Sequence, residues 1–243
     1  MSKSLQDKIA VVTGASRGIG YATAKALASE GAHIIAVART VGGLEELDDE
    51  IKQAGGSATL VPLDLKDGDG IDRLGAALFE RWQKLDILIG NAGILGRLTP
   101  LGHLKPEEWD DAFAVNVAAN WRLIRSLDPL LRAAPDAHAL FVTSRAAALN
   151  KAYWGTYGTT KAALDALAKT YAAECATTGV CVNLISPGPV RTALRASAMP
   201  GEDAETLPAP AAVGTAIADL LSGGKTEQGA TYRFDGGRLE IEQ

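Results

Sequence analysis

Short runs of β-branched and aliphatic residues alternate along this chain with longer stretches of helical periodicity. The strand-like runs are continuously apolar, which is typical of strands covered on both faces. Strands that alternate with helices through right-handed crossovers form a doubly wound parallel sheet. The sequence therefore predicts an α/β, Rossmann-like fold of about seven parallel strands with helices on both faces. The predicted strands are residues 9–13, 34–38, 58–63, 87–89, 139–143, 180–185 and 231–234.

Length and composition narrow the class of protein further. With 243 residues, 47% hydrophobic side chains and a net charge of −5, the chain predicts one folded domain spanning residues 1–243. The negative net charge argues against nucleic-acid binding, which needs a basic surface. No apolar run approaches the roughly 18 residues of a membrane span, and no signal-peptide-like stretch precedes the first strand. These features predict a cytoplasmic protein with no nucleic-acid or membrane partner.

Neither the cysteines nor the histidines predict a metal centre. Cys175 and Cys181 are too few for a disulfide framework or a four-ligand zinc site, and we interpret them as small buried residues. His33, His103 and His138 are scattered without the spacing of metal ligands. The sequence therefore predicts no bound metal.

A glycine-rich segment directly follows the first predicted strand and opens a predicted helix over residues 19–29. It reads Thr-Gly-Ala-Ser-Arg-Gly-Ile-Gly over residues 13–20. Glycines let the backbone approach a pyrophosphate, which the free N–H groups and the dipole of the helix N-terminus attract. An ordinary glycine-rich turn would carry the same residues. The position at the first strand-to-helix junction favours a dinucleotide site.

The end of the second predicted strand discriminates between dinucleotides. NAD-specific sites usually carry a carboxylate there for the ribose hydroxyls, but residues 36–40 read Ala-Val-Ala-Arg-Thr and the next carboxylate along the chain is Glu45. A 2′-phosphate needs cations, and a guanidinium group offers it a bidentate fork. Arg39 is placed to supply that fork, and Arg17 projects toward the same region. Both arginines could instead be ordinary surface charges. We predict NADP(H) as the cofactor.

Tyr157 and Lys161 are four residues apart on a predicted helix over residues 156–173, so they share one face. An ammonium within about 4–6 Å lowers the pKa of a neighbouring acid by roughly 1–3 units. We therefore expect Lys161 to lower the phenol pKa of Tyr157, which could then exchange a proton with a carbonyl or alcohol oxygen.

This spacing alone is weak evidence, because Tyr21 and Lys25 repeat it on the first predicted helix. Tyr157 has a further neighbour. Ser144 follows the strand predicted at residues 139–143, and ligands of doubly wound sheets bind at the carboxyl ends of strands. A hydroxyl there could hold the oxygen that Tyr157 protonates, so we interpret only the later pair as catalytic.

The motifs together resemble the short-chain dehydrogenase/reductase family, and the resemblance extends over nearly the whole chain to Asp-Gly-Gly at residues 235–237. Members that prefer NADP carry basic residues at the positions of Arg17 and Arg39. The residues that match the family pattern are Thr13, Gly14, Gly18, Gly20, Asp64, Asn91, Ala92, Gly93, Asn116, Ser144, Tyr157, Lys161, Pro187, Gly188 and Thr192.

The resemblance implies a role for several of these residues. Asp64 would hydrogen-bond the adenine with Leu65 lining its pocket, and Asn91 would support the sheet and the adjacent ribose. Lys161 would bind the nicotinamide ribose as well as act on Tyr157, and Asn116 would hold a water in a proton relay to Lys161.

At the nicotinamide end, the backbone of Val190 and the side chain of Thr192 would fix the carboxamide. The predicted catalytic residues are thus Ser144, Tyr157, Lys161 and Asn116. The predicted cofactor-binding residues are Gly14, Ser16, Arg17, Gly18, Ile19, Gly20, Arg39, Asp64, Leu65, Asn91, Ala92, Gly93, Tyr157, Lys161, Pro187, Gly188, Val190 and Thr192.

Two positions depart from the family pattern. Gly90 stands where many members have a second asparagine before Asn91, which loosens local contacts without removing chemistry. Arg145 follows Ser144, where small residues are common. It could bind an acidic substrate, but we interpret it as a surface or ion-paired residue.

The helix that carries Tyr157 is apolar almost all round, which is typical of a helix buried on both sides. One side would cover the sheet and the other could meet a second subunit. Family members form dimers and tetramers through this helix. We therefore predict a homodimer or homotetramer.

The leading hypothesis is an enzyme that transfers a hydride between NADP(H) and a small-molecule carbonyl or alcohol. The alternatives are a non-catalytic NADP(H)-binding or redox-sensing protein on the same fold, and an isomerase or dehydratase using the same site. Residues 191–210 are rich in proline and glycine and predict a long loop or broken helix that acts as a mobile substrate flap. The apolar Ile94, Leu95, Leu98 and Leu101 favour an uncharged substrate, and Trp154 could wall its pocket.

Overall fold

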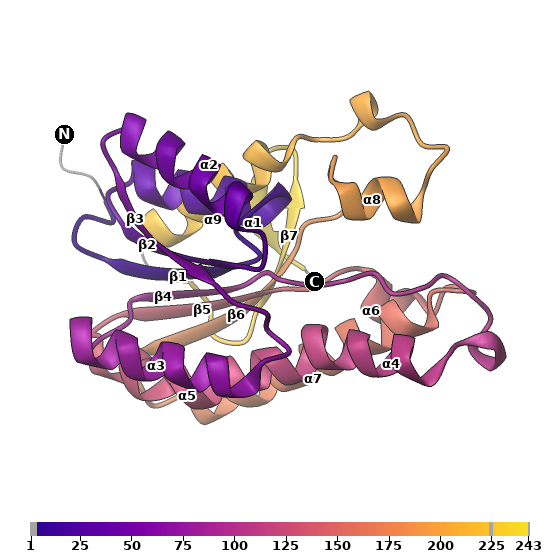
Figure 1. Ribbon diagram of the computed structural model, residues 1–243, viewed down its shortest axis with the longest axis horizontal. Helices are drawn as coiled ribbons and strands as arrows, with labels where there is room; N and C mark the ends of the chain where they lie inside the picture. Colours follow the sequence, from indigo (N-terminus) through magenta and orange to yellow (C-terminus); the bar gives the residue numbers. More distant parts are fainter. Residues whose placement is uncertain (1–3, 224–225, 243) are drawn as a thin grey trace.

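The computed structural model describes residues 4–223 and 226–242 (Figure 1). It contains one eight-stranded sheet in the order β3-β2-β1-β4-β5-β6-β7-β8, in which every pairing is parallel except β7 with β8. The predicted α/β fold class is confirmed, and all seven predicted strands are present with ends shifted by no more than two residues. The parallel strands are β1 (Ile9–Thr13), β2 (His33–Ala38), β3 (Ser57–Pro62), β4 (Ile87–Gly90), β5 (Ala137–Val142), β6 (Val180–Ser186) and β7 (Thr231–Asp235).

One strand of the sheet was not predicted from the sequence. β8 (Arg238–Ile241) pairs antiparallel with β7, and Asp235 lies opposite Arg238 across a turn at Gly236 and Gly237. Only Leu239 of β8 is partly buried. In this short edge strand Leu239 and Ile241 alternate with charged residues, so it lacks the continuous apolar run that revealed the other strands.

Helices cover both faces of the sheet (Figure 1). Leu27, Leu44 and Ile217 belong to one apolar core, and Leu74 and Leu164 belong to the core on the opposite face. One layer contains α1 (Gly18–Ser29), α2 (Val41–Gln53) and α9 (Pro210–Ser222), and the other contains α3 (Gly68–Trp82), α5 (Ala119–Ala133) and α7 (Gly155–Glu174).

Shorter elements connect these layers. None of the helices in the described part of the chain is both long and apolar enough to span a bilayer. The short elements are the 3-10 helices η1 (Leu101–His103) and η3 (Ala204–Thr206), the π-helix η2 (Ala114–Ala118), and the α-helices α4 (Pro106–Phe113), α6 (Ala146–Leu149) and α8 (Ala193–Ala198).

The strand order reverses beside β1, and this reversal places the site. β1 pairs with β2 on one side and with β4 on the other, so that Val11 lies opposite both Ile35 and Leu88. The connections from β1 and β4 therefore leave toward opposite faces of the sheet. In such sheets the crevice outside the carboxyl ends at the reversal is where ligands bind.

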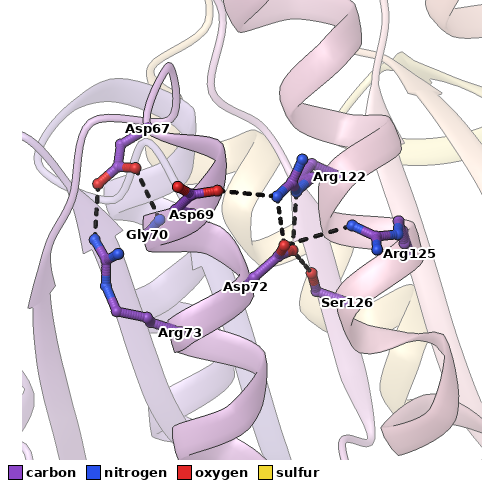
Figure 2. Close-up of polar contacts among 8 residues, drawn as sticks. All are labelled: Asp67, Asp69, Gly70, Asp72, Arg73, Arg122, Arg125 and Ser126. Carbon is purple, nitrogen blue, oxygen red and sulfur yellow. Dashed lines mark hydrogen bonds and ion pairs between the residues drawn. The ribbon is translucent and has the colours of Figure 1, made fainter.

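Charged and polar side chains at the surface join α3 to α5 (Figure 2). We call Asp69, Asp72, Arg122, Arg125 and Ser126 the α3–α5 cluster. At its centre the carboxylate of Asp72 accepts hydrogen bonds from Arg122 and from the hydroxyl of Ser126, with Arg125 at 3.4 Å. The Arg122 guanidinium, with help from Ser126, lowers the pKa of Asp72 to about 2. The helices are close here, since a Cβ on Gly75 would lie 2.9 Å from the Ser126 carbonyl oxygen.

Candidate active site

The glycine loop (residues 13–20) runs from β1 into α1 with little room for side chains. Gly14 and Gly18 have φ of +67° and +63°, in the left-handed region that favours glycine. A Cβ on Gly14 would lie 2.8 Å from the Asn91 side chain, and one on Gly20 would lie 2.4 Å from the Gly14 carbonyl oxygen. The N-cap residue Arg17 makes no side-chain capping bond. The first N–H groups of α1 are therefore available to an anion such as a pyrophosphate.

Thr13 and Asn91 fix the glycine loop against the end of β4. The Asn91 side chain donates to the Thr13 carbonyl oxygen at 2.8 Å. The Thr13 hydroxyl accepts from the backbone N–H groups of Asn91 at 3.0 Å and Ala92 at 3.1 Å. This bridge sets the spacing between two of the segments predicted to hold the dinucleotide.

A cleft of about 970 Å³ opens at the carboxyl ends of the parallel strands. It brings most of the predicted site residues together, whereas Gly20 and Asn116 lie outside its lining. The predicted residues that line it are Gly14, Ser16, Arg17, Gly18, Ile19, Arg39, Asp64, Leu65, Asn91, Ala92, Gly93, Ser144, Tyr157, Lys161, Pro187, Gly188, Val190 and Thr192.

Arg17 and Arg39 both line this cleft and are both exposed. The contact that Arg39 makes with Asp64 is loose, at 3.9 Å, and the Arg39 side chain remains 61% exposed. A Cβ on Gly43 would lie 2.7 Å from the Ser16 carbonyl oxygen, so α2 begins directly against the glycine loop. Two guanidinium groups are therefore available to a phosphate bound in the cleft.

Tyr157 lies in the first turn of α7 and is 8% exposed. Burial raises the pKa of its phenol, and the neighbouring Ser144 side chain acts in the opposite direction. The Lys161 Nζ is 5.8 Å from the centre of the Tyr157 ring. The sequence-based expectation of a lowered phenol pKa is therefore wrong for this structure, because desolvation disfavours the phenolate.

Lys161 is 3% exposed, and its Nζ donates to the Val142 carbonyl oxygen at 2.7 Å. Burial lowers the pKa of its ammonium to about 8, against the opposing field of Asp165. Lys161 thus stays charged near neutral pH, although its burial disfavours the charged form. It lies on the same face of α7 as Tyr157, as the spacing predicts.

Asn116 lies in the π-helix η2 and is fully buried. Its Nδ2 donates to the Ile94 carbonyl oxygen and the Thr160 hydroxyl, both at 2.9 Å, and its Oδ1 accepts from the Ile94 N–H at 2.8 Å. Both amide donors are thus used, and one acceptor position on Oδ1 remains. A Cβ on Gly93 would lie 3.3 Å from this Oδ1 and 3.4 Å from the Lys161 Nζ. A water there would have to donate to Asn116.

The flap segment, residues 191–210, contains α8 and η3. Arg191 pairs with Glu205 at 2.5 Å, and Arg195 pairs with Glu202 through two contacts of 2.6 Å. Thr192 caps α8 by accepting from the Arg195 N–H. The flap thus forms ion pairs within itself, and its mobility stays a prediction.

The other residues singled out in the sequence lie either in the cleft or outside it. Trp154 lines the cleft with its ring centre 6.1 Å from that of Tyr157. Arg145 and His103 are exposed and outside the lining. Leu98 and Leu101 also lie outside it, whereas the apolar neighbours Ile94 and Leu95 line it.

Two polar groups at the site were missed by the sequence analysis. Thr143, which also lines the cleft, donates its hydroxyl to the carboxylate of Asp165 on α7. The signal was present, since Asp165 continues the four-residue spacing of Tyr157 and Lys161. It was hidden because a single carboxylate on an otherwise apolar helix has no motif of its own.

Comparison with known proteins identifies the family. A family model described as short chain dehydrogenase matches residues 8–203. This chain belongs to that family. The predicted resemblance is therefore confirmed, and with it the assignment as an oxidoreductase.

Individual relatives agree with this assignment. The chain is 34% identical over 210 residues to YciK of Escherichia coli K12, described as an uncharacterized oxidoreductase, across 85% of this chain and 83% of that protein. A structure described as a short chain dehydrogenase from Pseudomonas syringae is similar with a TM-score of 0.91 and 35% identity, covering 96% of both chains. A Shigella flexneri short chain dehydrogenase, solved in complex with NADP, has a TM-score of 0.91 and 31% identity over 96% of this chain and 99% of that one.

Proposed function

We propose that this oxidoreductase transfers a hydride between NADP(H) and a carbonyl or alcohol substrate, with Tyr157 as the proton donor or acceptor. The observation that supports this most strongly is the convergence of Ser144, Tyr157 and Lys161 on one cleft at the carboxyl end of β5. Three groups from two elements meet where the fold places its ligand.

The residues present fit the cofactor. The uncapped N-terminus of α1 and the close-packed glycine loop suit a pyrophosphate, and Arg17 and Arg39 suit a 2′-phosphate. The similar Shigella flexneri protein was solved with NADP. Asp64 and Leu65 would hold the adenine end, and Val190 and Thr192 the carboxamide. When bound, the reduced nicotinamide supplies the hydride.

The protein's own residues position the substrate and move the proton. The Ser144 hydroxyl would hold the substrate oxygen, and the Tyr157 phenol would donate its proton to that oxygen in the reducing direction. A raised phenol pKa keeps Tyr157 protonated and therefore ready to donate. The buried ammonium of Lys161 would stabilise negative charge near this oxygen. Lys161 could then pass a proton to the Tyr157 phenolate, and a water held by Asn116 Oδ1 could return a proton to Lys161.

The two alternatives predict different behaviour. A non-catalytic NADP(H)-binding protein has no need to keep a hydroxyl, a phenol and a buried ammonium at one site, so their convergence disfavours it. An isomerase or dehydratase using the same residues would produce no net oxidation of NADPH. Monitoring the absorbance of NADPH with a panel of ketones, quinones, sugars and acyl thioesters separates the oxidoreductase from both alternatives.

We also propose that the chain forms homodimers or homotetramers through α7 and its neighbour α5. Trp121 on α5 is 49% exposed, and Ala162 and Ala166 on α7 are also exposed. Apolar surface of this kind is common at subunit interfaces. Sedimentation velocity at micromolar concentration should return a dimer or tetramer, and a monomer would contradict this proposal.

Tyr157→Phe tests the catalytic assignment directly. The variant loses the proton but keeps the ring, so NADPH binding should persist while turnover falls by about 10²–10⁴-fold. Turnover is measured by NADPH oxidation with the most active carbonyl compound of the panel, with NADH in parallel, and binding is measured by fluorescence titration. Near-normal turnover in the variant would refute the role of Tyr157, and preference for NADH would refute the choice of cofactor.

A further inference from the structure

The residues at the end of β5 contact polar side chains of α7. Three consecutive residues, Val142, Thr143 and Ser144, contact three residues of α7 that are spaced four apart. The Val142 carbonyl oxygen accepts from Lys161, and the Thr143 hydroxyl donates to Asp165. Ser144 lies close enough to Tyr157 to lower the pKa of its phenol. We call these six residues the β5–α7 seam. Residues four apart lie one above another on a helix, so the seam is a continuous line along α7.

The proposed chemistry uses two of the three α7 residues in the seam and leaves Asp165 unexplained. Asp165 is a partly buried carboxylate, and its hydrogen-bond donor Thr143 is only 3% exposed. A surface carboxylate without a role would not need a buried hydroxyl directed at it. Burial raises the pKa of Asp165, while the Thr143 hydrogen bond and the neighbouring lysines lower it.

We propose that Asp165, held by Thr143, is a positioning residue that keeps Lys161 protonated and directed toward the reacting centre. This inference rests on the proposed function and assigns it a residue that neither the sequence motifs nor the family pattern identified. Asp165 does not itself touch the cleft. It acts through the charge of Lys161, one helical turn away.

The physical need for a counter-charge follows from the burial of Lys161. Desolvation lowers the pKa of the ammonium to about 8, and Asp165 is the charged group that opposes this shift. The phenol of Tyr157 also faces Lys161. Around Asp165 the charged groups are Lys161 and Lys169 on α7 and Glu242 after β8, of which Glu242 disfavours its ionisation. Without Asp165, the buried ammonium would lose its proton at a lower pH.

Asp165→Asn removes the charge and keeps the shape and an oxygen that can accept from Thr143. In the cofactor-free protein with ¹³C-labelled lysine, the Cε signal of Lys161, assigned with Lys161→Arg, should titrate near pH 8 in the wild type. It should titrate about one pH unit lower in the variant. The alkaline limb of the pH profile of kcat/KM should move in the same direction and by a similar amount, while activity at pH 6 stays close to that of the wild type.

Two further variants separate this role from structural support. Glu174→Gln removes the same charge from the exposed far end of α7 and should leave both titrations unchanged. Thr143→Val keeps the carboxylate but removes its donor, and should lower the Lys161 titration by less than Asp165→Asn does. It also covers the case in which Asp165→Asn fails to fold.

Unchanged Lys161 titration in whichever of these variants folds, Asp165→Asn or Thr143→Val, would overturn the proposal, as would an equal shift in Glu174→Gln. The titration needs no substrate. If the wild type reduces no carbonyl compound, the proposed function fails while the role of Asp165 is still decided by the Lys161 signal.

Discussion

The α3–α5 cluster and the β5–α7 seam both join charged helix residues to a neighbouring element, but they do so in opposite environments. In the cluster the central Asp72 side chain is 37% exposed, whereas in the seam Lys161 is 3% exposed. Pairing with Arg122 lowers the pKa of Asp72 to about 2 and so favours its charged form. Burial lowers the pKa of Lys161 to about 8 and so disfavours its charged form.

This difference separates charges that hold the fold from a charge that serves chemistry. The cluster contains several arginines and carboxylates that compensate one another in solvent, so each contributes little and none is indispensable. The seam keeps one ammonium in a place where it lowers stability. A group that costs stability and stands beside a phenol in a cleft is a candidate for function.

Replacing the central cation of each region should have the largest and most different effects on turnover and on the thermal midpoint. Lys161→Met should reduce turnover by about 10³-fold, and should leave the thermal midpoint unchanged or raise it, because an apolar side chain replaces a buried charge. Arg122→Met should keep turnover within about twofold and lower the midpoint by a few degrees. NADPH oxidation rates and thermal unfolding at pH 7 measure both effects.

An exchange of these effects between the two variants would contradict this interpretation. If Arg122→Met lost turnover, or if Lys161→Met retained it while unfolding at a much lower temperature, the cluster rather than the seam would be the functional charge network. Circular dichroism of both variants controls for misfolding.

The sequence predicted the seam only in part, and the reason lies in how the information is distributed. Tyr157 and Lys161 were found through their helical spacing, and Ser144 through its place after an apolar strand. The direction of the Tyr157 pKa shift was not predictable in the same way. It depends on how many atoms from distant segments enclose the phenol, and a local pattern does not record that.

The elements of the fold were likewise predicted only where a local sequence pattern defines them. Parallel strands covered on both faces are continuous apolar runs, so all seven were predicted. β8 is short and mostly exposed, and α2 begins at Val41, with Gly42 and Gly43 in its first turn. The sequence pattern does not predict this first turn, because glycine disfavours helix. In the structure Gly43 packs against Ser16 there. Local propensity predicts the ends of elements poorly when tertiary contacts decide them.

The pH dependence of stability should distinguish the two regions next. For Asp72 the folded pKa is below the unfolded value, so its stabilisation is present above about pH 4 and is lost as the pH falls toward 2. For Lys161 the folded pKa of about 8 is below the unfolded value of 10.5, so the unfolded chain binds more protons between these values and stability rises with pH across this window.

Difference measurements isolate these two contributions. The free energy of unfolding of the wild type minus that of Lys161→Met should increase by about 3 kcal/mol between pH 8 and 10.5. The corresponding difference for Asp72→Asn should be constant at neutral pH and shrink only below pH 4. Urea unfolding at a series of pH values provides both, and a flat Lys161 difference would mean that its ammonium is hydrated in the folded protein.

The smallest effect is expected at the edge of the α3–α5 cluster. Arg125 is 59% exposed and lies 3.4 Å from Asp72, which already has Arg122 and Ser126 as partners. In a double-mutant cycle with Asp72→Asn and Arg125→Gln, the coupling should shift the thermal midpoint by less than about 2 °C in 0.1 M NaCl and vanish in 1 M NaCl. The Lys161 titration of the β5–α7 seam should not respond to the same salt, because ions screen buried charges far less than exposed ones. Equal salt sensitivity of the two would show that solvent reaches the seam, and the contrast between an exposed network and a buried charge would no longer hold.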